Sequence, residues 1–329
     1  MNRLITASMA FLCFTGYLYA QDSTTIDRTT DQNILNHLDF GITLGTTGIG
    51  IDLASPIGEY AQIRAGFAFM PHFNHTMHFG IQAYDTEKGL LQTKFDKMAD
   101  LMKSLTGYTV DSQIDMIGQP TFYNFNVLVD VFPFKNKKWH VTGGFYIGPS
   151  NIAKAFNTTE DMPTLLAVGM YDHIYDFVTG IDENGDPNYI SKPLYGTYYL
   201  DPDVGDQLKG IMTGYGRMGI HIGDKTNGTP YMMEPGADGM VKAKVKVNSF
   251  KPYIGFGYGN AKSENNKKYN ISFDCGIMFW GGTPQIITHD GTNLAELASV
   301  KGKVGTYVDI IKVFKVFPVI NLKISRRIF

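Results

Sequence analysis

Apolar and polar side chains alternate with a period of two along much of this chain. In residues 61–70 the apolar side chains stand at odd positions, and small or polar side chains, among them Arg64, stand between them. Successive side chains of a β-strand point to opposite faces, so this pattern predicts a strand with one apolar face. The predicted strands cover residues 38–54, 60–71, 76–84, 121–132, 139–147, 240–248, 251–259, 268–281 and 317–329.

Any one of these segments would also suit a half-buried strand of a soluble β-sandwich. Six or seven of them together favour a different class, because each is about 9 to 12 residues long and rich in aromatic residues near its ends. No run of 18 apolar residues follows residue 20, so no membrane-spanning helix is predicted. The pattern predicts an all-β fold, a closed antiparallel transmembrane barrel.

The predicted strands number nine, whereas a bacterial barrel needs an even number. The apolar positions switch from even to odd at the GTTG of residues 45–48. A turn that divides the first segment into two strands would explain the switch, and a glycine bulge within one long strand would also explain it. We expect about ten strands, within a range of 8 to 12.

Residues 1–20 have the features of a signal peptide for export. Arg3 precedes an uncharged and mostly apolar stretch, and Ala20 is a small residue suited to cleavage. An uncleaved anchor would need a longer apolar segment. Residues 21–329 then form one barrel domain, and Cys275 is its single thiol because Cys13 lies in the removed part.

Composition adds exclusions. The formal net charge is -2. Nucleic-acid binding needs a positive field, so a basic nucleic-acid-binding protein is excluded. The chain contains only two cysteines, which excludes a disulfide scaffold and a cysteine-rich zinc module. The 22 Phe, 19 Tyr and 36 Gly suit a glycine-rich and aromatic-rich β protein.

Two segments carry a resemblance to a known family. Residues 40–71, FGITLGTTGIGIDLASPIGEYAQIRAGFAFMP, resemble the first hairpin of Gram-negative outer-membrane β-barrel proteins, and residues 251–259, KPYIGFGYG, resemble a strand start common in that group. The resemblance implies a small to medium barrel with long loops in the outer membrane. It also implies contact with outer-membrane lipid and lipopolysaccharide, and recognition of the last strand, which ends in Phe329, by the barrel-insertion machinery.

The connections differ strongly in length. Short ones lie near residues 55–59, 72–75, 133–138 and 248–250, whereas long insertions occupy residues 85–120, 148–239 and 283–317. Apolar side chains at helical spacing in residues 91–105 and 162–178 predict helices inside two of the insertions. In the third, we expect short helices after Thr292, with Gly302 as a stop, followed by the apolar set Val304, Tyr307, Ile311 and Phe314. The apolar faces of these helices need cover, and the barrel mouth is the expected place.

A polar lumen is expected on the strand face opposite the apolar one. The candidate lumen residues are Arg64, His78, Asp130, His140, Lys242, Lys244, Lys246 and Asp274. A barrel of this size has an interior filled by side chains or wide enough for one small ligand. The three lysines would attract anionic solutes or pair with neighbouring carboxylates, and pairing is favoured.

Two weak metal motifs occur. His72, His75 and His78 are close in sequence, but no fourth ligand accompanies them, so hydrogen-bonded histidines near the membrane surface are favoured. Asp182, Asn184 and Asp186 have the spacing of a calcium loop, yet Pro187 and Pro193 replace the Gly and Glu that such a loop needs. A plain turn is favoured there. No metal or other cofactor is expected.

No catalytic motif occurs in the sequence, so the protein is not expected to be an enzyme. The sequence favours an outer-membrane barrel that binds a small solute or passively transports it through a lidded lumen. The alternative is a structural or surface-interaction protein that uses the barrel as an anchor and residues 148–239 for partner contact.

Overall fold

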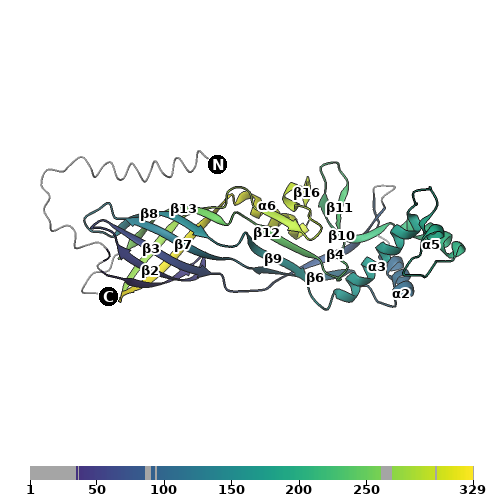
Figure 1. The fold of residues 1–329 in the computed structure, drawn as a ribbon, viewed down its shortest axis with the longest axis horizontal. Helices are drawn as coiled ribbons and strands as arrows, with labels where there is room; N and C mark the ends of the chain where they lie inside the picture. Colours follow the sequence, from purple (N-terminus) through teal and green to yellow (C-terminus); the bar gives the residue numbers. More distant parts are fainter. Residues whose placement is uncertain are drawn as a thin grey trace.

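The computed structural model describes residues 35, 37–85, 90–92, 95–260, 269–300 and 302–328. These residues form an elongated molecule, with a barrel at one end, a second sheet in the middle and most of the helices at the far end (Figure 1). The predicted signal peptide and Phe329 lie outside the described residues.

Eight antiparallel strands close the barrel, and each pairs with the barrel strand before it in the chain. The strands are β1 (Asp39–Gly45), β2 (Gly48–Pro56), β3 (Ala61–Phe69), β7 (Tyr123–Val131), β8 (Trp139–Ile147), β13 (Phe250–Gly259), β14 (Asn270–Phe279) and β17 (Val316–Arg327). β17 closes the ring against β1, with Ile324 opposite Ile42. The predicted closed antiparallel barrel is confirmed, with eight strands instead of about ten.

The strand count differs from the prediction for two reasons. Residues 38–54 form two strands, because a tight turn joins Gly45 to Gly48, and Gly48 adopts a φ of +94° that favours glycine. The segments at residues 76–84 and 240–248 are strands, but they belong to the second sheet and not to the barrel. Alternation with period two identifies a half-buried strand and does not say which sheet contains it.

The second sheet has nine strands and continues the barrel wall. Its order is β11 (Pro230–Met233), β10 (Arg217–Asp224), β4 (His75–Asp85), β6 (Gln113–Pro120), β9 (Asn151–Asn157), β12 (Lys242–Lys246) and β15 (Gln285–Thr288), with β5 (Leu90–Gln92) beside β4 and β16 (Ser299–Val300) beside β10. The strands from β4 to β15 follow the order of the barrel strands β3, β7, β8, β13 and β14, to which short linkers join them.

The insertions also contain helices, which are α2 (Phe95–Thr106), α3 (Met162–Thr179), α4 (Asn188–Ser191), α5 (Pro202–Tyr215), the 3-10 helix η2 (Leu294–Glu296) and α6 (Gly302–Val313). The helices predicted near residues 91–105 and 162–178 are confirmed as α2 and α3. Gly302 was expected to stop a helix, but α6 begins there. Within the described residues, no helix is long and apolar enough to cross a membrane.

We call the part beyond the barrel, residues 70–122, 148–249 and 280–315, the head. Its apolar core joins helices and sheet, and includes Met98 of α2, Leu165 of α3, Met212 of α5 and Ile220 of β10, which are all fully buried. The helices were expected to cover the barrel mouth. Instead α2, α3 and α5 gather at the end of the head far from the barrel, because the second sheet separates them from it (Figure 1).

All three insertions leave the same end of the barrel. At the other end lie the short turns after β2 and β7 and both ends of the barrel chain, where Asp39 pairs with Arg327. Short turns on one side and long loops on the other are typical of outer-membrane barrels.

A buried carboxylate lies in the head at the contact between α3 and β10. Asp172 is 4% exposed, and one of its oxygens accepts a hydrogen bond from the backbone N–H of Met218 at 2.9 Å. Burial, together with the nearby carboxylate of Glu234, raises the pKa of Asp172 well above its ordinary value, although the Met218 N–H and the Arg217 guanidinium oppose the rise. The ionised form of Asp172 therefore destabilises the folded head.

We expect Asp172→Asn to stabilise the protein at neutral pH. Because the folded-state pKa is raised, the free energy of unfolding of the wild type falls as the pH rises from the unfolded value near 4 to the folded value. The amide keeps an acceptor for the Met218 N–H and does not ionise. The free energy of unfolding of the variant should therefore not fall over this pH range on account of position 172. Urea unfolding at several pH values between 4 and 8, followed by the intrinsic fluorescence of the head, measures the free energy of unfolding of both proteins.

Asp176→Asn is the matched control, because Asp176 lies on α3 like Asp172 and pairs with Arg217 of β10, but its side chain is 57% exposed. The pH dependence of its unfolding should stay close to that of the wild type. An Asp172→Asn variant with the wild-type pH dependence would show that Asp172 is ionised without cost.

Candidate functional site

The outer face of the barrel is apolar. Side chains that point away from the lumen are about half exposed, among them Phe125 at 60%, Ile271 at 57% and Ile42 at 52%. The same face continues around every strand, and the strand that closes the ring contributes Ile320, Leu322 and Ile324. An apolar surface of this extent indicates a lipid-facing belt, because a soluble protein rarely exposes so large a patch.

Aromatic residues gather at the turn end of this belt. Trp139 and Tyr258 are about half exposed, and their rings lie 4.9 Å apart between centroids. On the neighbouring strand pair, the guanidinium of Arg326 lies 5.9 Å from the ring centroid of Tyr269. Aromatic girdles of this kind mark the level at which lipid meets water.

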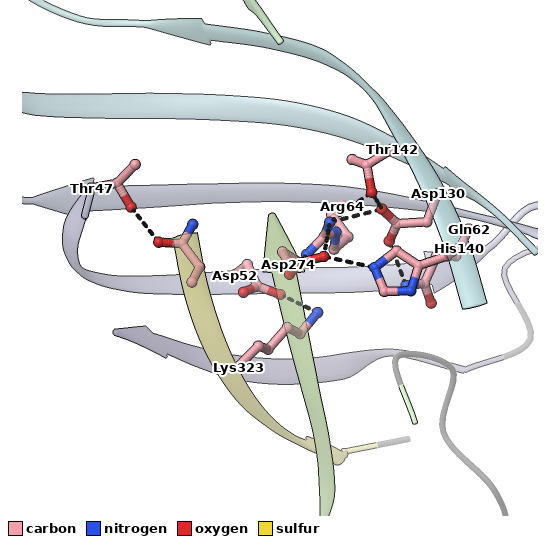
Figure 2. A network of polar contacts seen from close by, with 10 residues as sticks. Thr47, Asp52, Gln62, Arg64, Asp130, His140, Thr142, Asp274 and Lys323 are labelled. Carbon is pink, nitrogen blue, oxygen red and sulfur yellow. Dashed lines mark hydrogen bonds and ion pairs between the residues drawn. The ribbon is translucent and has the colours of Figure 1, made fainter. Parts of the chain in front are cut away.

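The inner face of the barrel contains a network of charged groups centred on Arg64 (Figure 2). Its guanidinium bridges two carboxylates, at 2.7 Å from Asp130 Oδ1 and 3.1 Å from Asp274 Oδ2. All three residues are at most 4% exposed. Isolated buried charges are very costly, so each of these groups depends on the others.

Neighbouring polar side chains satisfy the remaining positions of the two carboxylates. Thr142 and Gln62 each donate to Asp130 at 2.7 Å, and the Nε2 of His140 lies 2.6 Å from Asp274 Oδ1. The strand register explains the first two contacts, because Asp130 lies directly opposite Gln62 on one side and Thr142 on the other. A carboxylate only accepts, so His140 donates to Asp274 through Nε2.

Glycines on the same inner face make room for the large polar groups. A Cβ at Gly257 would lie 2.3 Å from His140 Nε2, and one at Gly41 would lie 2.9 Å from the Lys323 side chain. Lys323 forms a second buried ion pair, at 2.8 Å from Asp52. The inward glycines of the sequence thus correspond to the long side chains that face them across the lumen.

A layer of aromatic and other apolar side chains fills the barrel where it meets the head. We call it the aromatic layer. The buried side chains of this layer are Phe122, Leu128, Tyr146, Val247, Tyr253, Met278, Trp280 and Val319. Between this layer and the Arg64 network lies a cavity of ≈ 20 Å³, lined by groups that include Asp52, Asn126 and Tyr253. That volume holds about one water molecule. The part of the lumen that the structure describes is therefore filled with side chains.

The structure brings together only half of the predicted lumen residues. Arg64, Asp130, His140 and Asp274 lie inside the barrel and touch one another. His78 lies on β4 of the head, where it contacts Asp115 on the surface.

The three predicted lumen lysines also lie in the head. Lys242, Lys244 and Lys246 are on β12, and Lys242 pairs with Asp238 at 2.6 Å in solvent. In the head the apolar face points inward and the polar face points to water, which is the reverse of the barrel. The sequence pattern is the same in both parts, so the prediction placed these four residues on the wrong side.

Sequence reasoning did not single out Gln62, Asp52 and Thr142, which complete the network. They occupy the same strand phase as Arg64, Asp130 and His140, so phase alone would have placed them on the inner face. Their contacts depend on register and on the distance across the lumen, and no sequence signal gives that distance.

The two weak metal motifs have ordinary hydrogen bonds. His75 Nε2 lies 2.6 Å from the hydroxyl of Tyr307, and His72 is exposed in the segment between β3 and β4. The carboxylate of Asp182 accepts from the backbone N–H groups of Asn184 and Asp186, as in an Asx turn. Among the described residues, no cluster of three or more ligating side chains could hold a metal ion.

No protein-family model matches the chain, and no curated protein matches it. Similar solved structures include CarO of Acinetobacter baumannii, with 13% identity over 88% of this chain and 97% of that chain and a TM-score of 0.35. CarO2 of the same organism has 12% identity over 88% and 98% and a TM-score of 0.35. A major outer membrane protein from Thermus thermophilus has 10% identity over 88% and 98% and a TM-score of 0.27.

The protein has the features of outer-membrane β-barrel proteins, to which its sequence motifs are similar. These features are a closed ring of an even number of antiparallel strands, an apolar outer belt, a polar interior and long insertions at one end only. They are observed in this chain itself and do not depend on any one similar structure.

We expect Arg64→Met to destabilise the barrel by about 3–5 kcal/mol, because it leaves Asp130 and Asp274 buried together without their cation. Urea unfolding in detergent, followed by the heat-dependent shift in gel migration, measures the loss. The triple variant Arg64→Met/Asp130→Asn/Asp274→Asn removes all three charges together. It should recover much of the lost stability, because no unpaired charge remains among these residues.

Arg326→Met is the matched control, since Arg326 is exposed on the outer face near Tyr269. It should change the free energy of unfolding by less than about 1 kcal/mol. Equal free energies of unfolding for Arg64→Met and Arg326→Met would contradict the central role of the buried network.

Proposed function

We propose that this protein is an outer-membrane surface protein whose closed barrel is an anchor and whose head meets a partner outside the cell. The filled lumen carries this proposal. Between the Arg64 network and the aromatic layer there is space for about one water molecule, and solute passage needs a continuous opening. This observation favours the anchor over passive transport of a solute.

The direction of the insertions supports the placement of the head. Outer-membrane barrels have short turns on the periplasmic side and long loops on the extracellular side. In this chain the tight turns around Glu59 and Lys137 lie at one end, and the head lies at the other. The head therefore faces the exterior.

The far end of the head offers a surface for a partner. Tyr195, Tyr198 and Tyr199 form an exposed aromatic patch in the loop that precedes α5, and Tyr195 is 84% exposed. Backbone hydrogen bonds hold this loop in shape, including one from Leu194 N–H to the carbonyl of Tyr198 at 2.9 Å. Exposed tyrosines on an ordered loop are common in binding surfaces, because they supply contact area at low entropic cost. This loop belongs to the insertion that was expected to contact a partner.

We expect the purified protein to give no ion conductance in planar lipid bilayers, because its lumen is filled. A 16-strand porin, reconstituted in the same way, provides the positive control. Insertion of the protein is checked by heat-dependent gel migration of the same sample. Reproducible single-channel steps from the wild-type protein would favour transport instead.

We expect a cysteine at position 195 to react with a membrane-impermeant maleimide on intact Gram-negative cells. The Tyr195→Cys change is made in a Cys275→Ser background, which removes the free thiol of the barrel. The matched control is Glu59→Cys at the turn end, where the Glu59 side chain is 59% exposed. It should react only after the outer membrane is permeabilised, and the reverse result would overturn the proposed orientation.

A further inference from the structure

Helix α6 lies at the end of the head that adjoins the barrel (Figure 1). Its inner face packs on the head core through the buried Val308 and the partly buried Val304 and Ile311. On β4, His75 Nε2 lies 2.6 Å from the Tyr307 hydroxyl, which ties the helix to the start of the second sheet. Figure 1 shows α6 beside the mouth of the barrel. The helix is thus fixed in place and is not a loose connection.

The outer side of α6 carries an exposed apolar stripe. Tyr307, Ile310 and Phe314 lie at spacings of three and four residues, which puts them on one stripe, and Val313 flanks it with 78% of its surface exposed. The outer face of α2 is polar by contrast, with Lys97, Asp100 and Lys103 exposed. The exposed side of α6 also carries Thr306 and Asp309, so the apolar residues form a stripe beside these polar ones, as in an amphipathic helix at a membrane surface.

The lipid-facing belt of the barrel begins directly after this helix. Phe314 stands four residues before Pro318, which is the first outward side chain of the belt on β17. The barrel wall next to β17 is short, because the β1–β2 turn already ends beside Pro318 and Ile320. Thr46 of this turn donates to the carbonyls of both residues at 2.9 Å. Four residues span at most about 14 Å. The exposed stripe therefore ends within about 14 Å of the first residue of the belt on β17.

We propose that the exposed apolar stripe of α6 lies in the lipid boundary on the head side of the membrane. Ile310, Val313 and Phe314 would meet the upper acyl chains, while Lys315, exposed beside them, would reach the lipid phosphates. The partner of this surface is lipid. The inference requires that the barrel spans a bilayer, but it does not depend on which side of the cell the head faces or on a partner at the tyrosine patch.

The test is the environment of a nitroxide spin label attached to Val313→Cys in the Cys275→Ser background. The full chain is reconstituted in vesicles of phosphatidylcholine and phosphatidylglycerol. Collision rates with oxygen, which concentrates in lipid, and with a water-soluble nickel complex are then compared. The expected oxygen-to-nickel ratio at position 313 shifts toward that of Ile320→Cys in the barrel belt.

Met170→Cys is the matched control, because Met170 is an apolar helix residue of the head with 45% exposure that belongs to α3, far from the mouth. The oxygen-to-nickel ratio of a label at position 170 should be close to that of a label on Tyr195→Cys, which is exposed to water. A ratio at position 313 equal to that of Met170→Cys would overturn the proposal. Low collision rates with both reagents would also overturn it, since protein would then cover the helix. Ile310→Cys gives a second readout of the same stripe.

Discussion

Backbone N–H and C=O groups inside a membrane find no water, so every one of them must be bonded within the protein. The pairing of β17 with β1 meets this demand, because it removes the last two free strand edges. Closure by consecutive antiparallel strands also fixes an even number and brings both ends of the barrel chain to one side. The insertions must then leave through the other side, where water or other protein groups can bond their backbone. The separation of barrel and head follows from this one constraint.

Closure with eight strands leaves an interior just wide enough for side chains, and this width decides what the lumen contains. Lys323 and His140 fit because Gly41 and Gly257 leave space beside them. Charges in so narrow a space cannot keep their water shells, so they are paired with Asp130, Asp274 and Asp52. The same crowding that holds the barrel together closes it to solutes. The proposed anchor role and the stability of the barrel therefore have one physical origin.

The two halves of the molecule use one sequence pattern in opposite senses. In the barrel the apolar positions face lipid, whereas in the head they face a core and the polar positions face water. Residues 139–147 and 240–248 alternate in the same way, yet His140 is buried in the lumen and Lys244 is exposed on the head. The pattern was therefore enough to find both strands, and it was not enough to say which medium lies on either side. Helix α6, which exposes an apolar stripe, lies beside the barrel mouth, where the two media meet.

Local sequence determined the barrel strands, helices α2 and α3, and the inward direction of Arg64, Asp130, His140 and Asp274, but it did not predict α5 or most strands of the second sheet. These features depend on periodicity and turn chemistry, which act over a few residues. Only the tertiary structure decided that the barrel has eight strands, that residues 76–84 and 240–248 build a second sheet, and that the lumen is filled. Those outcomes depend on which distant strands pair and on how wide the closed ring is. Arg64 and Asp274 are 210 positions apart in the chain, and only ring closure brings them within 3.1 Å of each other.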